Sequence, residues 1–583
     1  MRDEIGKALK EALKTLGASK AAFALERSDT FEHGDYATNA ALIAAKILKK
    51  NPKEVAEALK KELEGKIEGV RKIEVAGAGF INFFLSDQVL NKTLRDIISA
   101  GDTWGSAPKI KERWLIEHTS PNPNKAMHIG HLRNNITGMA IANIAEFRGV
   151  EVIRDCIDNN RGIAIAKLMW GYVKFAHRGG TPIEDISYWH EHQGEWQTPE
   201  EMDMRPDRFV DALYVQGSED FEHSLDVEKK VRQMVVDWEH KEKIVWELWE
   251  KVLAYSYAGQ RMTLGRLGNK WDRVWHEHEH YQEGKNLVED GLRKGVFKKL
   301  EDGAVLTNLA AYNLPDTIVM KSDGTSLYIT QDIALTRLKR DTYHPDRLFW
   351  VIGPEQTLAL KQVFAVCEQL GIGKYTDYTH ISYGYMSLKG EAKMSSRKGN
   401  VLFIDDLIDQ VKESVKDLLK EAELPASKIE TIAEEVAVGA VKFGILKVGR
   451  NSSIVFDVER ATDLHGDTGP YVQYAHTRTC SLLKHAEGKG MKSEVIEDAE
   501  ANEVVRLLAH FPNVVERSNS ELEPHYIATY LLELASLFSR WYADVHILDD
   551  ASDRGHKIAI VDAVRITLGN GLRLLGIPAP EEM

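Results

Sequence analysis

The chain has 583 residues, of which 43% are apolar and 28% charged, an ordinary globular composition that excludes a mainly disordered protein. At about 150 residues per domain, this length predicts about four domains. No uncharged apolar run approaches the roughly 18 residues that span a bilayer, and the amphipathic N-terminal stretch is unlike a signal peptide. Three cysteines without a CxxC pair exclude a disulfide scaffold and a cysteine-based zinc site. We therefore expect a cytoplasmic protein with no membrane partner and no protein-bound zinc or other metal.

The net charge of −14 is unevenly distributed along the chain. Residues 181–250 contain 19 acidic and 7 basic side chains, so this one segment has a net charge of −12. The rest of the chain is nearly neutral and could present a basic groove to phosphates. Overall acidity therefore does not exclude a nucleic-acid partner.

Residues 1–105 read as a small α/β domain. A first helix is followed by helices predicted over 40–50 and 53–63, and then by an alternating apolar stretch at 73–85. Glycines inside that stretch predict a tight bend between two extended pieces. Residues 106–112 form a plausible linker.

A strand at 113–117, a helix at about 129–148 and a strand at 151–155 follow the linker. The order strand, polar loop, helix, strand predicts a doubly wound parallel sheet, with the functional loop at the carboxyl end of the strand. We assign residues 106–400 to this Rossmann-like domain. An acidic, tryptophan-rich insertion at about 180–269 interrupts it.

The alternating pattern resumes with a strand at 348–353 and a helix at 358–370. From Asp405 onward the pattern is helical almost throughout, which predicts an all-α bundle over 401–583. Two apolar stripes support this prediction: Leu407, Val411, Val415 and Leu418, and then Ile527, Leu531, Leu534, Phe538 and Tyr542.

The loop after the first strand of the sheet contains His128-Ile129-Gly130-His131 at a predicted helix start. A helix N-terminus offers unpaired N–H groups and partial positive charge, which stabilise an anion. Two imidazoles three residues apart face the same side of the first turn, and Gly130 permits close approach. Taken alone, the motif favours two surface histidines at a helix start over a functional pair.

A second loop, Lys393-Met394-Ser395-Ser396-Arg397-Lys398-Gly399, concentrates cations and hydroxyls that could hold a triphosphate. Alone, it could be a solvated basic loop. The two loops together, one after the first strand and one after a late strand, resemble the paired HIGH and KMSKS-type signatures of class I aminoacyl-tRNA synthetases.

Within that class the chain resembles the arginyl-tRNA synthetase family nearly from end to end. The segments that carry the resemblance are HTSPNPNKAMHIGHLRNN, LYITQDIA, VIGPEQTLALKQVF, KMSSRKGN, FDVERATDLHGDTGPYVQYAHTR and the tail DAVRITLGNGLRLLGIPAPEEM. HGDYATN and GFINF in the first hundred residues are similar to the family's N-terminal domain, which contacts the outer corner of tRNA.

The resemblance implies a pocket in which carboxylates and a tyrosine hydroxyl bind the arginine guanidinium, while side-chain amides hold its α-amino group. The matching positions are Glu117, Asn122, Tyr328, Asp332 and Gln356. A planar guanidinium with five donors needs such fixed acceptors. If helical, Tyr328 and Asp332 are one turn apart and can face one pocket. Asp332 could also be a helix N-terminal or solvated acid. Glu277 is a further candidate for the pocket.

The resemblance also implies the nucleotide and tRNA contacts. ATP would bind at His128, Gly130, His131, Lys393 and Met394, with Mg²⁺ held through the phosphates. The catalytic set adds Lys125, Ser395 and Ser396, and the division of labour between Lys125 and Lys393 stays open. The residues implied to contact tRNA(Arg) are Asn82, Tyr471, Tyr474 and Trp541, with core packing as the alternative for the aromatic ones. A monomer is expected from the family.

The predicted activity is ATP-dependent ligation of L-arginine to tRNA(Arg) through an arginyl-adenylate. Two other interpretations remain open: a catalytically silent tRNA-binding protein on the same scaffold, and a class I synthetase for another amino acid. His276, His278 and His280 would share one face if residues 276–280 were a strand, which could bind a metal, but a polar edge strand or loop is the favoured interpretation.

Overall fold

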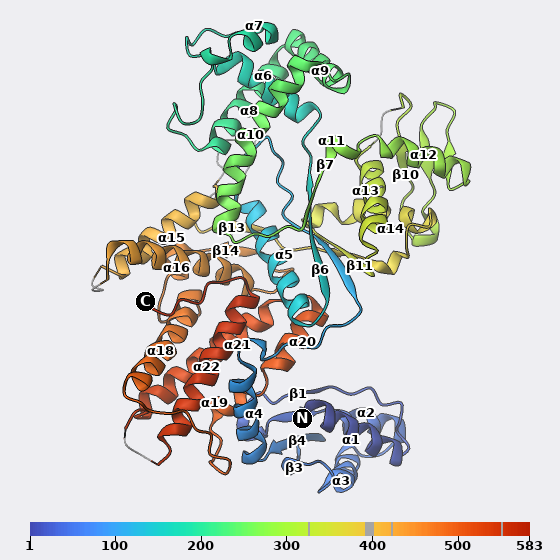
Figure 1. Cartoon of the computed structure of the whole chain (residues 1–583). Helices are drawn as coiled ribbons and strands as arrows, with labels where there is room; N and C mark the ends of the chain where they lie inside the picture. Colours follow the sequence, from blue (N-terminus) through green and yellow to red (C-terminus); the bar gives the residue numbers. More distant parts are fainter. Residues whose placement is uncertain (325–326, 391–401, 421–423, 550–551) are drawn as a thin grey trace.

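The computed structural model describes residues 1–583 except 325–326, 391–401, 421–423 and 550–551. A parallel sheet lies at the centre of the molecule, with the green insertion on one side of it (Figure 1). The blue N-terminal domain lies on the opposite side, next to the red C-terminal helices. None of the helices in the described part of the chain is long and apolar enough to cross a membrane.

The N-terminal domain pairs four antiparallel strands in the order β1-β2-β4-β3. The predicted bend lies between the two long strands, as a hairpin turn that contains Gly77 and Gly79, both with positive φ. The elements are α1 (Arg2–Thr15), β1 (Leu25–Arg27), β2 (Tyr36–Thr38), α2 (Ala40–Leu48), α3 (Pro52–Leu63), β3 (Val70–Ala76), β4 (Phe80–Leu85) and α4 (Asp87–Ala100).

The central sheet has five parallel strands in the order β12-β11-β5-β6-β7, which confirms the doubly wound prediction. Its strands are β5 (Arg113–Glu117), β6 (Glu151–Asp158), β7 (Arg273–His276), β11 (Arg347–Val351) and β12 (Tyr378–Ile381). Strand β5 is buried on both faces. Trp114 and Ile116 pack in the same cluster as Ile141 of α5 (Ile129–Phe147), whereas Leu115 packs in the cluster of Ile333 on α13 (Tyr328–Tyr343). Helices thus cover both faces.

The remaining elements around the sheet connect β7 to β11, connect β11 to β12 or follow β12. They are α11 (Glu277–His280), α12 (Glu283–Arg293), β8 (Phe297–Lys299), β9 (Val305–Thr307), β10 (Thr317–Met320), α14 (Thr357–Gln369) and β13 (Met386–Leu388). Strands β8, β9 and β10 form a separate antiparallel sheet.

The insertion is a helical unit with its own core. Its helices are α6 (Ile163–Phe175), α7 (Ile186–Glu191), α8 (Pro206–His223), α9 (Leu225–Glu239) and α10 (Lys243–Arg266). Five tryptophans are buried inside it, namely Trp170, Trp189, Trp196, Trp238 and Trp249, and Trp246 is partly buried against them. They therefore stabilise the insertion itself. Helix α6, which precedes the predicted insertion, belongs to the same core.

The C-terminal part is helical as predicted, apart from β14 (Ile454–Phe456), which pairs with β13. Its helices are α15 (Ile404–Leu418), α16 (Ala426–Leu446), α17 (Val458–Ala461), α18 (Gly469–Gly488), α19 (Glu503–Leu508), α20 (Phe511–Glu521), α21 (His525–Asp544) and α22 (Arg554–Leu574). The predicted stripe on α15 is buried at Leu407, Val411 and Val415. Leu418 is 53% exposed, so including it in the stripe was wrong; it is the last residue of the helix.

The N-terminal domain packs against the C-terminal helices. Helix α4 lies against α22, and the Arg506 guanidinium pairs with the buried Asp35 carboxylate at 2.7 Å. Asn91 of α4 donates to the backbone carbonyls of Glu497 and Ala499. The two ends of the chain thus form one lobe (Figure 1).

Candidate active site at the carboxyl edge of the sheet

The candidate site lies where the chain leaves β5 and β11. These neighbouring strands are parallel, with Glu117 opposite Trp350, so the loops that follow them emerge at the same edge. Strand β6 lies on one side of β5 and β11 on the other, which makes this edge the switch point where doubly wound sheets bind ligands.

The two predicted histidines lie together at the start of α5. His128 is the N-cap residue, and its Nδ1 accepts a hydrogen bond from Gly130 N at 3.1 Å. His131 Nδ1 accepts from His128 N at 3.2 Å, and the two ring centres are 4.1 Å apart. A Cβ at Gly130 would lie 2.7 Å from His128 Cε1. The glycine therefore leaves room for the His128 ring, a reason that the sequence alone did not reveal.

These hydrogen bonds determine which nitrogen of each histidine ring carries the proton. Because each Nδ1 accepts a backbone N–H, the proton of the neutral imidazole lies on Nε2. Burial lowers the pKa of His131 to about 3 and also lowers the pKa of His128. Both rings are thus neutral at physiological pH, and each offers one Nε2–H donor to an oxyanion.

Lys125 is the cation of this turn. After the larger effect of burial, its positive charge contributes to the lowered pKa of both His128 and His131. Its Nζ lies 5.2 Å from the centre of the Tyr214 ring. The residues predicted from the second loop, Lys393, Met394, Ser395 and Ser396, lie outside the described residues.

A buried lysine pairs with Glu117, one of the predicted arginine ligands. Lys339 Nζ lies 2.6 Å from Glu117 Oε2 and 2.6 Å from Asp155 Oδ2. Burial alone would lower the pKa of Lys339, but the two carboxylates outweigh it and raise the pKa above its usual value. Glu117, predicted to bind the substrate, therefore has an internal cation as its partner.

Asp332 lies beside this ion pair without sharing in it. Burial, followed by the negative charges of Glu117 and Glu277, raises the pKa of Asp332 to about 7, although Lys339 opposes the shift. Glu277 is half-buried, and its Oε1 is 3.6 Å from Arg161 Nη1. Burial raises its pKa as well. Two incompletely compensated carboxylates thus lie close enough to interact, which is the environment a bound cation would stabilise.

The other predicted arginine ligands, Tyr328, Gln356 and Asn122, have exposed side chains. Tyr328 is the first residue of α13, one turn before Asp332 as predicted, but its side chain is 89% exposed. Gln356 is exposed at the end of the short turn after β11. Asn122 is also exposed, and its Oδ1 accepts from Asn159 Nδ2 at 3.3 Å.

The residues predicted to contact tRNA differ in exposure. Tyr474 is exposed on α18, and the Arg478 guanidinium lies 4.8 Å from its ring centre. Tyr471 and Trp541 are partly buried against the core, and Asn82 is buried in the middle of β4. Tyr474 is thus the accessible aromatic side chain among the four.

Sequence reasoning missed two polar residues that hold the site together. Lys339 lies seven residues after Asp332 and therefore on the same face of α13; a lysine among the apolar positions of that helix was the available signal. Asn134 accepts from Thr119 N and donates to Val351 O, both at 2.7 Å, so it joins the loop after β5 to the end of β11.

The histidines at 276–280 do not share the face of a strand. Strand β7 ends at His276, and Glu277–His280 is a helical turn, so the interpretation of this segment as one strand was wrong. His276 Nδ1 lies 2.6 Å from Asp158 Oδ2, and Asn160 Nδ2 lies 2.9 Å from His278 Nδ1. Across the described ranges, no group of three or more His, Cys, Asp or Glu residues is arranged to hold a metal ion.

Replacing Lys339 by methionine is expected to destabilise the protein by about 3–5 kcal/mol, because it leaves Glu117 and Asp155 buried without their cation. Thermal denaturation at pH 8 measures this loss. Burial raises the pKa of Asp155 to about 6, so this carboxyl becomes neutral as the pH falls and the loss is smaller at pH 5. Lys339 itself, with its raised pKa, stays charged across this range.

The matched control is Lys420→Met, which removes a lysine whose partner, Asp417, is also exposed. It should melt like the wild type at both pH values, since exposed ion pairs contribute little. Equal melting of Lys339→Met and Lys420→Met would contradict the buried ion-pair assignment.

Three family models match the chain, and together they span most of it. The model described as "tRNA synthetases class I (R), catalytic domain" covers residues 93–458. The "Arginyl tRNA synthetase N terminal domain" covers 2–85, and the "DALR anticodon binding domain" covers 472–583. Together with the parallel sheet and its histidine turn, these matches define the chain as a class I aminoacyl-tRNA synthetase.

Comparison with individual proteins identifies the family within this class. An arginine–tRNA ligase of Treponema denticola is 35% identical over 525 residues, covering 86% of this chain and 85% of that protein. One from Lactococcus lactis subsp. cremoris is 31% identical over 99% of both chains. The chain belongs to the arginyl-tRNA synthetase family. Its fold also matches the structure of Thermus thermophilus arginyl-tRNA synthetase, with a TM-score of 0.79, 24% identity and full coverage of both chains.

Proposed function

We propose that this arginine–tRNA ligase activates arginine at the carboxyl edge of its sheet, with Asp332 and Glu277 as the partners of the guanidinium. The observation that carries the proposal is the charge arrangement beside Glu117. Lys339 pairs with both Glu117 and Asp155, whereas among the described residues Asp332 forms no ion pair and Glu277 has only the more distant Arg161 guanidinium, at 3.6 Å. A forked cation with five donors suits this pair of acids.

In the first step the arginine carboxylate attacks the α-phosphorus of ATP in line, and pyrophosphate leaves. Little covalent work falls to the protein, so positioning and charge stabilisation dominate. The Nε2–H groups of His128 and His131 donate to the α-phosphate oxygens as negative charge develops, and Lys125 contributes its positive charge beside them. Asn122 and Gln356, both at the rim, hold the α-amino group.

The second loop has the predicted role in this scheme. Lys393 and Met394 contact the β- and γ-phosphates, and Ser395 and Ser396 supply hydroxyl donors. ATP enters as its magnesium complex, in which phosphate oxygens hold the ion, so the metal is part of the substrate.

In the second step the terminal ribose hydroxyl of tRNA(Arg) attacks the adenylate and releases AMP. Tyr474, exposed beside Arg478, is the first candidate for stacking on an unpaired base, a contact worth about 1–3 kcal/mol. Tyr471, Trp541 and Asn82 are less accessible and complete the predicted set. The proposal also takes the protein to be a cytoplasmic monomer. We take its domains to be the predicted ones, residues 1–105, 106–400 and 401–583.

The test is to charge unfractionated tRNA with each of the twenty amino acids in turn, and to measure arginine-dependent exchange of pyrophosphate into ATP with and without tRNA. Incorporation of arginine alone, with exchange that requires arginine, supports the proposal. Charging with a different amino acid would refute the pocket assignment. Absence of exchange in the presence of cognate tRNA would instead support the catalytically silent tRNA-binding protein.

A further inference from the structure

Helix α8 of the insertion touches the turn that carries the catalytic histidines. Asp211 Oδ1 accepts a hydrogen bond from Ala126 N at 3.2 Å, two residues before His128. One turn further along α8, the Tyr214 ring lies under Lys125. The insertion therefore contacts the first signature loop directly.

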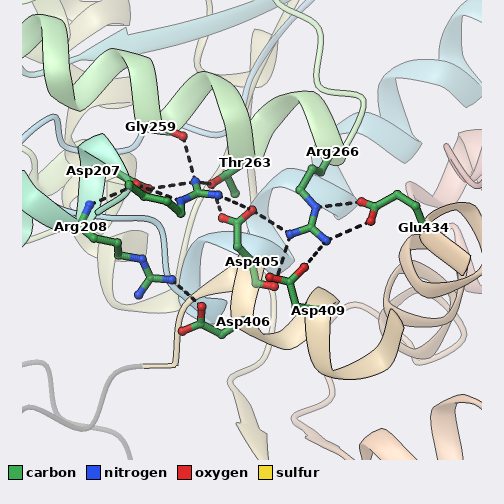
Figure 2. A network of polar contacts seen from close by, with 10 residues as sticks. Asp207, Arg208, Gly259, Thr263, Arg266, Asp405, Asp406, Asp409 and Glu434 are labelled. Carbon is green, nitrogen blue, oxygen red and sulfur yellow. Dashed lines mark hydrogen bonds and ion pairs between the residues drawn. The ribbon is translucent and has the colours of Figure 1, made fainter. Parts of the chain in front are cut away.

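The same helix contacts the start of α15. The Arg208 guanidinium lies 3.1 Å from the centre of the Phe403 ring, and its Nη2 is 2.9 Å from Asp406 Oδ1. Arg205, directly before α8, places its Nη1 3.0 Å from Asp405 Oδ1. Figure 2 shows the Arg208–Asp406 pair and the contacts of Asp405 in one view.

The C-terminal end of α10 also contacts the start of α15. Arg266 pairs with Asp405 at 3.1 Å, with Asp409 at 2.7 Å and with Glu434 at 2.8 Å (Figure 2). Thr263 donates its hydroxyl to the Asp405 carboxylate, which is buried. The start of α15 is thus held from two helices of the insertion.

The two segments that α8 contacts are themselves joined. His128 and Phe403 form an isolated antiparallel bridge, and Ile404 N donates to Met127 O at 3.1 Å. A shift of Phe403 is therefore transmitted to the backbone of His128.

Helix α8 is itself held closely by α6. A Cβ at Gly217 would lie 2.1 Å from Lys167 O, and one at Gly171 would lie 2.1 Å from Leu213 O. Such close backbone packing leaves the helix little freedom to slide, so it can act as a fixed support.

We propose that α8 positions the His128–His131 turn for adenylate formation, with Asp211 acting through Ala126 and Arg208 acting through Phe403. Both are positioning residues, because neither reaches a reacting atom. The inference rests on the proposed function and gives the acidic insertion a role in the first chemical step. A misplacement of about 1 Å in a catalytic group can cost about a hundredfold in rate, so loss of either contact should be measurable.

The experiment compares Arg208→Ala with Arg232→Ala in the full chain. Arg232, on α9 of the same insertion, pairs with Glu228 at the surface, so its replacement removes the same charge without touching either segment. We expect kcat of pyrophosphate exchange to fall about tenfold to a hundredfold in Arg208→Ala. The KM for arginine should be unchanged, and the control should behave as wild type. Arg208→Lys, which keeps the positive charge but not the guanidinium over the Phe403 ring, should recover part of the loss.

A second pair of variants keeps the test decisive if Arg208→Ala does not fold. Asp211→Asn retains the oxygen that accepts from Ala126 N, and Asp211→Ala does not. We expect a loss of kcat in the alanine variant and rescue in the asparagine variant, at equal melting temperatures. Equal kinetics of both Asp211 variants, or a loss of kcat in Arg208→Ala that only follows its unfolded fraction, would overturn the inference. A wild-type protein without arginine-dependent exchange would instead overturn the proposed function.

Discussion

Asp332→Asn is expected to lower kcat/KM for arginine by about 10²–10³-fold, because truncating one member of a buried charge pair costs several kcal/mol. The wild-type kcat/KM should itself depend on pH. The raised pKa of Asp332, about 7, means that this carboxyl is neutral below that pH and charged above it, whereas the substrate guanidinium is charged throughout. The wild-type kcat/KM therefore rises as the pH increases through about 7, and the variant loses this rise. Steady-state pyrophosphate exchange from pH 6 to 9 measures both effects.

Although Asp332→Asn should lower kcat/KM, it should not lower the stability of the protein. Because the folded-state pKa of Asp332 is raised, ionisation of this group costs folding free energy at pH 8, and the cost disappears as the pH falls below the unfolded value. Asp332→Asn should therefore melt at or above the wild-type temperature at pH 8. The control is Asp341→Asn on the exposed side of α13, which should leave kcat/KM unchanged. Undiminished arginine turnover in Asp332→Asn would refute the assignment of the guanidinium partner.

His131→Ala is expected to reduce kcat of pyrophosphate exchange by about 10²–10³-fold with little change in the KM for arginine, since removal of one oxyanion donor has this effect in other enzymes. Because burial keeps the pKa of His131 at about 3, this ring adds no break to the pH profile between pH 6 and 9. Single-turnover formation of the adenylate isolates the affected step.

The comparison needs a control for folding, because the His131 ring also accepts from His128 N and so caps the helix. Loss of such a cap costs about 1 kcal/mol, which a melting curve can separate from the kinetic effect. His485→Ala, at the exposed end of α18, is the matched variant and should leave kcat unchanged. A full-rate His131→Ala enzyme would exclude the proposed donor.

The order of elements could be predicted from the sequence because burial leaves a periodic signature. The strand at 113–117 and the helix from 129 were predicted at the residues where β5 and α5 begin. The position of the His128–His131 turn could also be predicted, because its residues lie between this strand and this helix in the sequence. The tautomers of the two histidine rings could not be predicted, because they depend on which backbone N–H group donates to each Nδ1.

Long-range contacts were the part that the sequence could not predict. Lys339 and Glu117 are 222 positions apart, and nothing local marks them as partners. The sequence marked the insertion as rich in tryptophan but did not show that most of these side chains fill its core, because composition alone does not say which side of a helix faces inward. Arg208 and Phe403 likewise meet only through tertiary structure.

The pairing of Arg506 with Asp35 joins residues 471 positions apart, and it has a consequence for synthesis on the ribosome. Helices α4 and α22, which pack together, are separated by a similar length of chain. At about 5–20 residues per second, α22 is synthesised roughly 25–95 s after α4. During that interval the first hundred residues expose apolar surface that the finished enzyme covers. Nascent-chain chaperones therefore have their longest opportunity to bind at this face, and slow translation of the last third of the message prolongs it.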